Sequence, residues 1–214
     1  TGDWVSGPET LTEEELGGNR NNFYADCLAN KLDTDEFWQS RMPDHSKIET
    51  PMLSTANWGG QGLHPRGNFE GFVRSASKNK WLEVHGIEHW THFYTDYGLD
   101  LQKRFFGHFL KGEDTGWMEN QPKVQLQIRY PGERFVERHE NEWPLARTDW
   151  TKFYIHPDKM TISEEPQTSK SSVKYKGLSD RVTFLSNPLT EDMEITGPIA
   201  SKLWVASETN ATPP

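Results

Sequence analysis

The chain has 214 residues, a formal net charge of −9 and only 33% hydrophobic residues, and its mean hydropathy is −0.84. Aromatic residues nevertheless make up 12% of it, which supplies enough buriable surface to argue against a disordered chain. The acidic balance and the absence of a dense Lys/Arg block argue against nucleic acid as a partner. No apolar run reaches the ~18 residues of a membrane-spanning helix, so we expect no membrane partner.

The chain contains a single cysteine, Cys27, so no disulfide can form within it. A lone thiol fits a reducing compartment and favours the cytoplasm. We expect no cofactor and no bound metal.

The first 50 residues are expected to be helical and irregular. A capping start at 10–15 and apolar residues at helical spacing in 22–31 and 34–41 predict short helices. Two Gly and three Asn within 17–22 predict a loop between the first two of them.

The next segment alternates strands and helices. Strands are predicted at 51–58 and 80–85, and helices at 66–77 and 94–110. This order is typical of a parallel sheet with flanking helices. The second helix has the clearest pattern, with a predicted stop at Gly112 and an apolar side formed by Leu101, Phe105, Phe106, Phe109 and Leu110.

After Glu113 the pattern changes to short strands separated by Pro, Gly and Asn. Such spacing indicates a β-sandwich or jelly roll, and the chain ends before a sandwich of this kind looks complete. We therefore predict an α/β fold followed by an all-β one, with domains at 1–115 and 116–214. The strands are expected at 124–130, 134–140, 151–155, 159–162, 172–176, 181–186 and 193–205.

A histidine-rich loop follows the strand at 80–85 and precedes the helix at 94–110. This is the position at which α/β-hydrolases carry their general base. A general base of this kind needs a Ser or Cys nucleophile to activate, yet no G-x-S-x-G elbow occurs in the chain. Either this interpretation is wrong, or the chain is a piece of a larger enzyme.

Several short motifs, in order over roughly residues 35–205, resemble the X-Pro dipeptidyl-peptidase family, which includes cocaine esterase. The segment 50–58 (TPMLSTANW) resembles the family's "I-x-V-P-x-L-x-x-x-G-W" strand, and 82–89 (LEVHGIEH) resembles its "L-x-x-G-P-W-x-H" segment. Further matches are 37–41 (FWQSR), 104–112 (RFFGHFLKG), 122–124 (PKV), 142–144 (EWP), 187–189 (NPL) and 195–198 (ITGP).

The resemblance implies the later part of an α/β-hydrolase domain followed by the start of a jelly-roll domain. It implies a serine hydrolase of ester or amide bonds, including X-Pro peptide bonds, with His89 as the catalytic base and the nucleophile on missing sequence. The expected triad acid aligns with Gly60, which has no carboxylate. The alternatives for the acid or orienting group are Glu88, Asp96 and Asn57, a carboxylate from missing sequence, or a subgroup without activity.

Two other functions stay open. One is a non-catalytic protein that binds carbohydrate or another ligand, with Trp117, Trp143 or Trp150 as a sugar platform. The other is a metal-dependent hydrolase that uses His85, His89 and His92. The expected partners are a small ester or peptide substrate and the remainder of the polypeptide. Because a cut parallel sheet has open edges, a homo-oligomer is a further expectation for the isolated chain.

Overall fold

The structure is a computed structural model that describes residues 10–19, 21–60, 64–87, 90–176 and 181–207. The chain divides into two compact units, Thr1–His45 and Ser46–Pro214. The first unit contains α1 (Glu13–Asn19), α2 (Phe23–Ala29) and α3 (Glu36–Gln39). The helices predicted at 22–31 and 34–41 are therefore present but shorter, and α1 extends from the predicted capping start into the predicted loop at 17–22.

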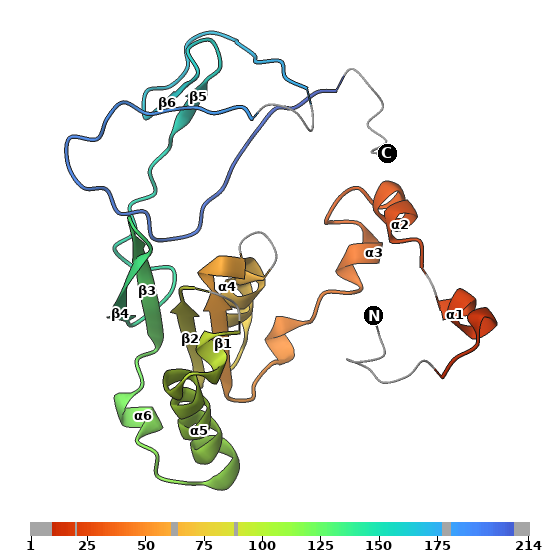
Figure 1. Cartoon of the computed structure of the whole chain (residues 1–214), viewed down its shortest axis with the longest axis vertical. Helices are drawn as coiled ribbons and strands as arrows, with labels where there is room; N and C mark the ends of the chain where they lie inside the picture. Colours follow the sequence, from red (N-terminus) through yellow and green to blue (C-terminus); the bar gives the residue numbers. More distant parts are fainter. Residues whose placement is uncertain (1–9, 20, 61–63, 88–89, 177–180, 208–214) are drawn as a thin grey trace. The chain divides into compact units, whose positions relative to one another are not determined.

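The second unit is built around a four-stranded sheet in the order β1-β2-β3-β4 (Figure 1). Its strands are β1 (Met52–Asn57), β2 (Lys80–His85), β3 (Val124–Tyr130) and β4 (Arg134–Glu140). The first three run parallel and β4 returns antiparallel to β3. The parallel sheet with helical connections is thus present as predicted, and β2, β3 and β4 have the predicted bounds.

Helices supply the parallel connections. The connection from β1 to β2 contains η2 (Trp58–Gly60) and α4 (Pro65–Arg74), and the one from β2 to β3 contains η3 (His92–Tyr94), α5 (Asp96–Lys111) and α6 (Trp117–Asn120). Thr95 caps α5, since its Oγ1 accepts from the Gly98 amide at 3.3 Å. The helix ends at Gly112, whose φ of 68° places it in the left-handed region.

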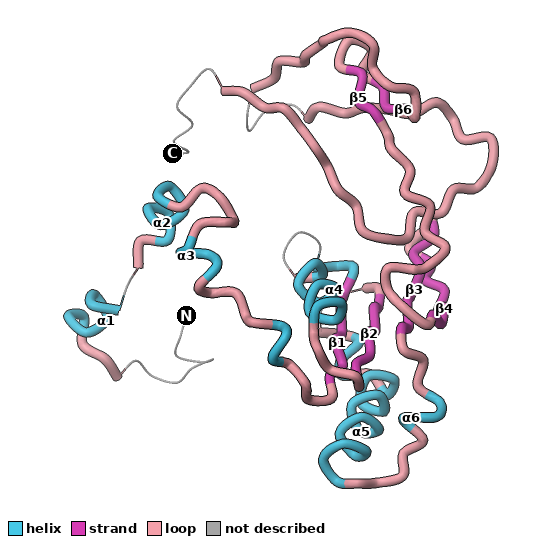
Figure 2. Tube along the Cα trace, turned by 180° about the vertical axis from the view of Figure 1, so that it is seen from behind, coloured by secondary structure: helices cyan, strands magenta, loops and turns pink. Residues whose placement is uncertain are grey.

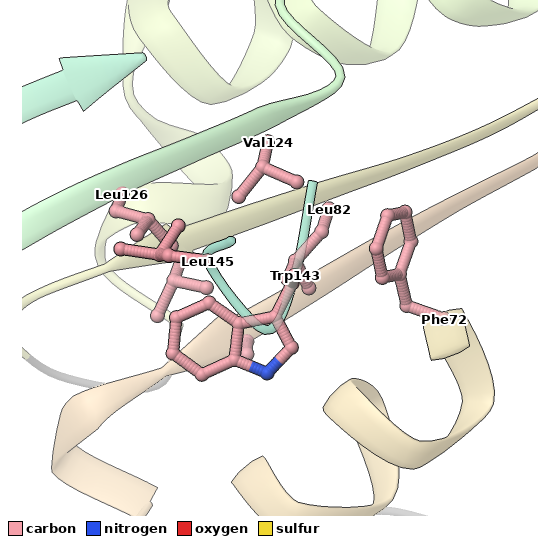
Figure 3. Packing of buried hydrophobic residues seen from close by; sticks show 8 residues of the cluster. Phe72, Leu82, Val124, Leu126, Trp143 and Leu145 are labelled. Carbon is pink, nitrogen blue, oxygen red and sulfur yellow. The ribbon is translucent and has the colours of Figure 1, made fainter. Parts of the chain in front are cut away.

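Both faces of the parallel strands are covered, which explains why β2 is buried along almost its whole length. On one face, Leu82 and Val84 pack with Phe72 of α4 and with Trp143 and Leu145 (Figure 3). On the other face, a second cluster consists of Trp81, Leu101, Phe105 and Trp117. The predicted apolar side of α5 is therefore only partly correct, because Phe106 is 48% and Leu110 75% exposed.

The remaining strands are few. β5 (Tyr154–His156) and β6 (Thr161–Ser163) form a small antiparallel sheet, and Figure 2 shows the segments that follow them as loop. The strands predicted at 172–176 and 193–205 are absent from the described residues there, and that at 181–186 is reduced to one bridge between Thr161 and Leu185. A jelly roll thus stays a prediction. The domain boundary at 115/116 also stays a prediction. The sheet itself continues across it, because β3 and β4 hydrogen-bond into the sheet that contains β1 and β2.

Candidate active site

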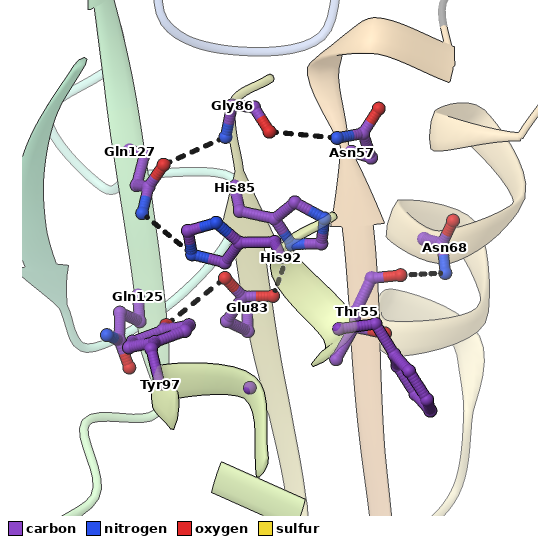
Figure 4. A network of polar contacts seen from close by, with 12 residues as sticks. Thr55, Asn57, Asn68, Glu83, His85, Gly86, His92, Tyr97, Gln125 and Gln127 are labelled. Carbon is purple, nitrogen blue, oxygen red and sulfur yellow. Dashed lines mark hydrogen bonds and ion pairs between the residues drawn. The ribbon is translucent and has the colours of Figure 1, made fainter. Parts of the chain in front are cut away.

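Polar side chains gather on one face of the sheet, at the carboxyl ends of the parallel strands. Side chains alternate between the two faces of a strand, and the register pairs Asn57 with His85. Figure 4 shows these two residues together with Glu83, Gln127, His92 and Tyr97. Ligands of open α/β sheets bind outside the carboxyl ends of the strands, so this end of the sheet is where chemistry is expected.

Glu83 and His85 form a buried carboxylate–imidazole pair. The Nδ1 atom of His85 lies 2.9 Å from Oε2 of Glu83, and the two residues are 7% and 2% exposed, respectively. The Tyr97 hydroxyl donates to Oε1 of Glu83 at 3.2 Å, so both carboxylate oxygens have a partner. Burial, and then the neighbouring Glu83, raise the pKa of Tyr97, which keeps its hydroxyl protonated as a donor.

The other ring nitrogen of His85, Nε2, is buried without a hydrogen-bond partner among the described residues. Since its Nδ1 faces a carboxylate, Nδ1 carries the ring hydrogen of the neutral tautomer and Nε2 is left as an acceptor. The ring of His92 stacks on that of His85, with centroids 4.7 Å apart and planes inclined by 10°. Desolvation, followed by the nearby His85, lowers the pKa of His92, so His92 favours the neutral form.

The connection after β2 is held by side chains from both neighbouring strands. Asn57 of β1 donates through Nδ2 to the carbonyl oxygens of Gly86 at 2.9 Å and of Ile87 at 3.1 Å. Gln127 of β3 accepts from the Gly86 amide at 2.9 Å and lies 3.3 Å from Nε2 of His92. This connection therefore has fixed positions at its start and at its end.

The predicted site residues fall in different places. His89 and Glu88 lie outside the described residues, so their roles as base and acid stay predictions. Asp96 is exposed in the first turn of α5. Asn57 is 4% exposed, and its amide nitrogen contacts backbone carbonyls of the connection that precedes His89. Its predicted role as an orienting group also stays a prediction.

Sequence reasoning missed Glu83, Tyr97 and Gln127. One signal could have found Glu83, because a charged residue between Leu82 and Val84 in a buried strand needs a partner. The long sequence separation from β2 to Tyr97 and Gln127 left no comparable signal for these two residues. Among the described residues, no group of three or more His, Cys, Asp and Glu side chains is placed to hold a metal ion. The metal site predicted from His85, His89 and His92 includes His89, which lies outside the described residues.

Comparison with known proteins points to one family. Residues 115–212 match the model of the X-Pro dipeptidyl-peptidase C-terminal non-catalytic domain. Two crystal structures of a CocE/NonD family hydrolase from Staphylococcus aureus match 70% and 72% of the chain, with 34% and 33% identity and TM-scores of 0.62 and 0.64. The family model and the two structures support the X-Pro dipeptidyl-peptidase and CocE/NonD hydrolase family as the one that this chain resembles. The resemblance predicted from the motifs is thereby confirmed.

The chain spans 27% and 28% of the two CocE/NonD hydrolase chains. No curated protein matches it. Within the described part of the chain, no helix combines the length and apolar character needed to cross a membrane. The match to the non-catalytic domain includes β3 and β4, whereas β1, β2 and α5 precede it.

Proposed function

We propose that the protein is a member of this hydrolase family that acts on ester or amide bonds, including X-Pro peptide bonds, by serine chemistry. The chain supplies the histidine of the triad, and the serine lies on polypeptide outside these 214 residues. The observation that carries the proposal is the histidine-rich connection at the carboxyl end of β2, beside the polar cluster on the sheet. His89 is the proposed general base, on the strength of the family motif at 82–89.

In this mechanism, His89 takes the proton of the serine hydroxyl as that oxygen attacks the substrate carbonyl carbon, and it returns the proton to the leaving group. A triad needs a group that fixes the imidazole tautomer and stabilises the imidazolium. Glu88, Asp96 and Asn57 remain the candidates within this chain. Asn57 is supported by its contact with the backbone of the same connection.

The experiment is covalent labelling with a fluorophosphonate, combined with the intact mass of the native polypeptide. A native chain longer than 214 residues should label on a serine, and His89→Ala should abolish the labelling. His139→Ala is the matched control, because its side chain is 56% exposed on β4 and should leave labelling unchanged. A native polypeptide of only these residues that folds alone would contradict the proposal.

A second candidate is a non-catalytic ligand-binding protein, which is favoured by the match of 115–212 to a non-catalytic domain. Of the three Trp residues considered for a sugar platform, Trp117 and Trp143 are 0% and 9% exposed, so neither can present a ring face to a sugar. Trp150 is 63% exposed. Under this candidate, the native protein would not label with fluorophosphonate, and Trp150→Ala would remove binding to immobilised oligosaccharides.

A further inference from the structure

A single side chain from β3 contacts both ends of the connection between β2 and α5. Oε1 of Gln127 accepts from the backbone amide of Gly86, and Nε2 of Gln127 lies 3.3 Å from Nε2 of His92 (Figure 4). The two contact points lie six positions apart in the sequence. In the register between β2 and β3, the last pair is Val84 with Leu126. The Gln127 side chain thus binds the buried Gly86 amide just past the end of this ladder.

The chemistry of the two contacts fixes the orientation of the carboxamide. A peptide N–H can only donate, so the oxygen of Gln127 must face Gly86 and its NH₂ group must face His92. The Nε2 atom of His92 must then be an unprotonated acceptor, with the ring hydrogen on Nδ1. The lowered pKa of His92 agrees with this neutral tautomer. A protonated His92 would place two donors opposite each other.

Gln127 is itself held in place. The indole nitrogen of Trp58 donates to the Gln127 backbone carbonyl at 2.7 Å, and the Trp58 ring packs against the core beside Phe69. Trp58 directly follows Asn57, whose side-chain amide donates to the carbonyl oxygen of Gly86. The start of the connection is therefore held from both neighbouring strands.

Close packing further restricts each end of the connection. A Cβ atom at Gly86 would overlap the ring of Phe135 on β4, and one at Gly98 would overlap the backbone carbonyl oxygen of His92. The same carbonyl oxygen accepts from the Thr95 hydroxyl at 2.7 Å. The backbone at both ends is thus defined by neighbours on β4 and α5 as well as by Gln127.

We propose that Gln127 is a positioning residue for the proposed catalytic histidine, because it fixes both ends of the connection in which residue 89 lies. This inference rests on the proposed function and extends it. Gln127 lies within the residues matched to the non-catalytic C-terminal domain. That domain then contributes to catalysis by holding a connection of the hydrolase sheet, although it supplies none of the groups that react.

The experiment compares Gln127→Ala with Gln125→Ala. Gln125 is the matched control because it lies two residues earlier on the same face of β3, is 6% exposed, and accepts from Gln121 at 2.9 Å. In the native full-length polypeptide, Gln127→Ala should lower kcat for an activated ester about 10- to 100-fold, as expected for a misplaced catalytic group, with KM little changed. Gln127→Glu keeps an acceptor for the Gly86 amide and should restore part of the rate.

A second readout does not depend on activity. In the native full-length polypeptide, ¹⁵N NMR should find the His92 ring hydrogen on Nδ1, and Gln127→Ala should shift this tautomer equilibrium and speed exchange of the Gly86 amide. Gln125→Ala should do neither. An unchanged tautomer and exchange rate would overturn the inference, and so would an equal loss of kcat in both alanine variants.

The two proposals fail in different ways. If His89→Ala abolishes hydrolysis but Gln127→Ala leaves kcat unchanged, the proposed function stands and the inference is overturned. If His89→Ala has no effect on hydrolysis, both are overturned.

Discussion

Asn57→Ala should destabilise the sheet of the second unit by about 1.5–4.5 kcal/mol. The variant removes the donor to the Gly86 carbonyl oxygen, and leaving a buried acceptor unpaired costs about 1–3 kcal/mol. The Ile87 carbonyl also loses its bond, but Ile87 is 54% exposed, so water can replace the donor and we expect the smaller net cost of about 0.5–1.5 kcal/mol. Asn68→Ala is the matched control, since the Asn68 amide also donates to a backbone carbonyl, that of Thr55 at 2.9 Å, at a more exposed site.

The assay is urea unfolding of the full chain at pH 7, followed by tryptophan fluorescence. With a urea m-value of about 1–3 kcal/mol/M, Asn57→Ala should lower the midpoint by about 0.5 M or more, and Asn68→Ala by clearly less. Asn57→Asp tests the direction in which stability changes with pH. The introduced carboxylate cannot donate to a carbonyl oxygen, so its pKa should be raised, and the lost stability should partly return as the pH falls and the carboxyl group is protonated. Equal midpoints for the Asn57 and Asn68 alanine variants would refute this account of the buried amide.

Three further outcomes follow from the same contacts. Trp117→Ala should cost about 3–5 kcal/mol because this ring is fully buried, whereas Trp204→Ala should change the urea midpoint little because Trp204 is 93% exposed; similar effects would contradict the described core. Because burial lowers the pKa of His92 from its ordinary value of 6.5, the unfolded chain binds the proton before the folded chain does as the pH falls. The free energy of unfolding, measured by urea unfolding, should therefore decline below pH 6.5 more steeply in the unsubstituted chain than in His92→Gln. Gly86→Ala should destabilise the sheet by overlap with Phe135, and adding Phe135→Ala should recover part of the loss, so strictly additive effects of the two substitutions would exclude this overlap.

The sequence predicted the buried strands well because their patterns are local. The segment 80–85 is a short apolar run between turn signals, and 124–130 alternates cleanly, so β2 and β3 have the expected bounds. The segment 193–205 carries a comparable share of apolar residues, yet it contains no strand among the described residues. A strand also needs a hydrogen-bonding neighbour, and local pattern cannot report whether one is present. In this segment, Ile199 and Val205 are 83% and 85% exposed, as expected for an extended segment without a covering layer.

The site was less predictable than the sheet for a related reason. Asn57 could be chosen as a polar residue at the end of a strand, but its partner carbonyls lie 29 and 30 positions away. The Gly86 amide and Gln127 are separated by 41 positions. Which side chains meet at the carboxyl ends of the strands depends on strand order and register, and neither is encoded in the local pattern of β2 or β3.

The change of pattern near Gly112 separates two kinds of local sequence, but it does not separate two sheets. β3 follows that change, yet Leu126 of β3 pairs with Val84 of β2 and is buried in the same cluster. If β3 were removed, Leu82 and Val84 would lose apolar neighbours and β2 would become an open edge. The Gly86 amide would lose its acceptor as well. The segment matched to the non-catalytic domain is thus required to complete the sheet that holds the histidine-rich connection. For this physical reason, we expect that cutting the chain at residue 115 would abolish the proposed activity.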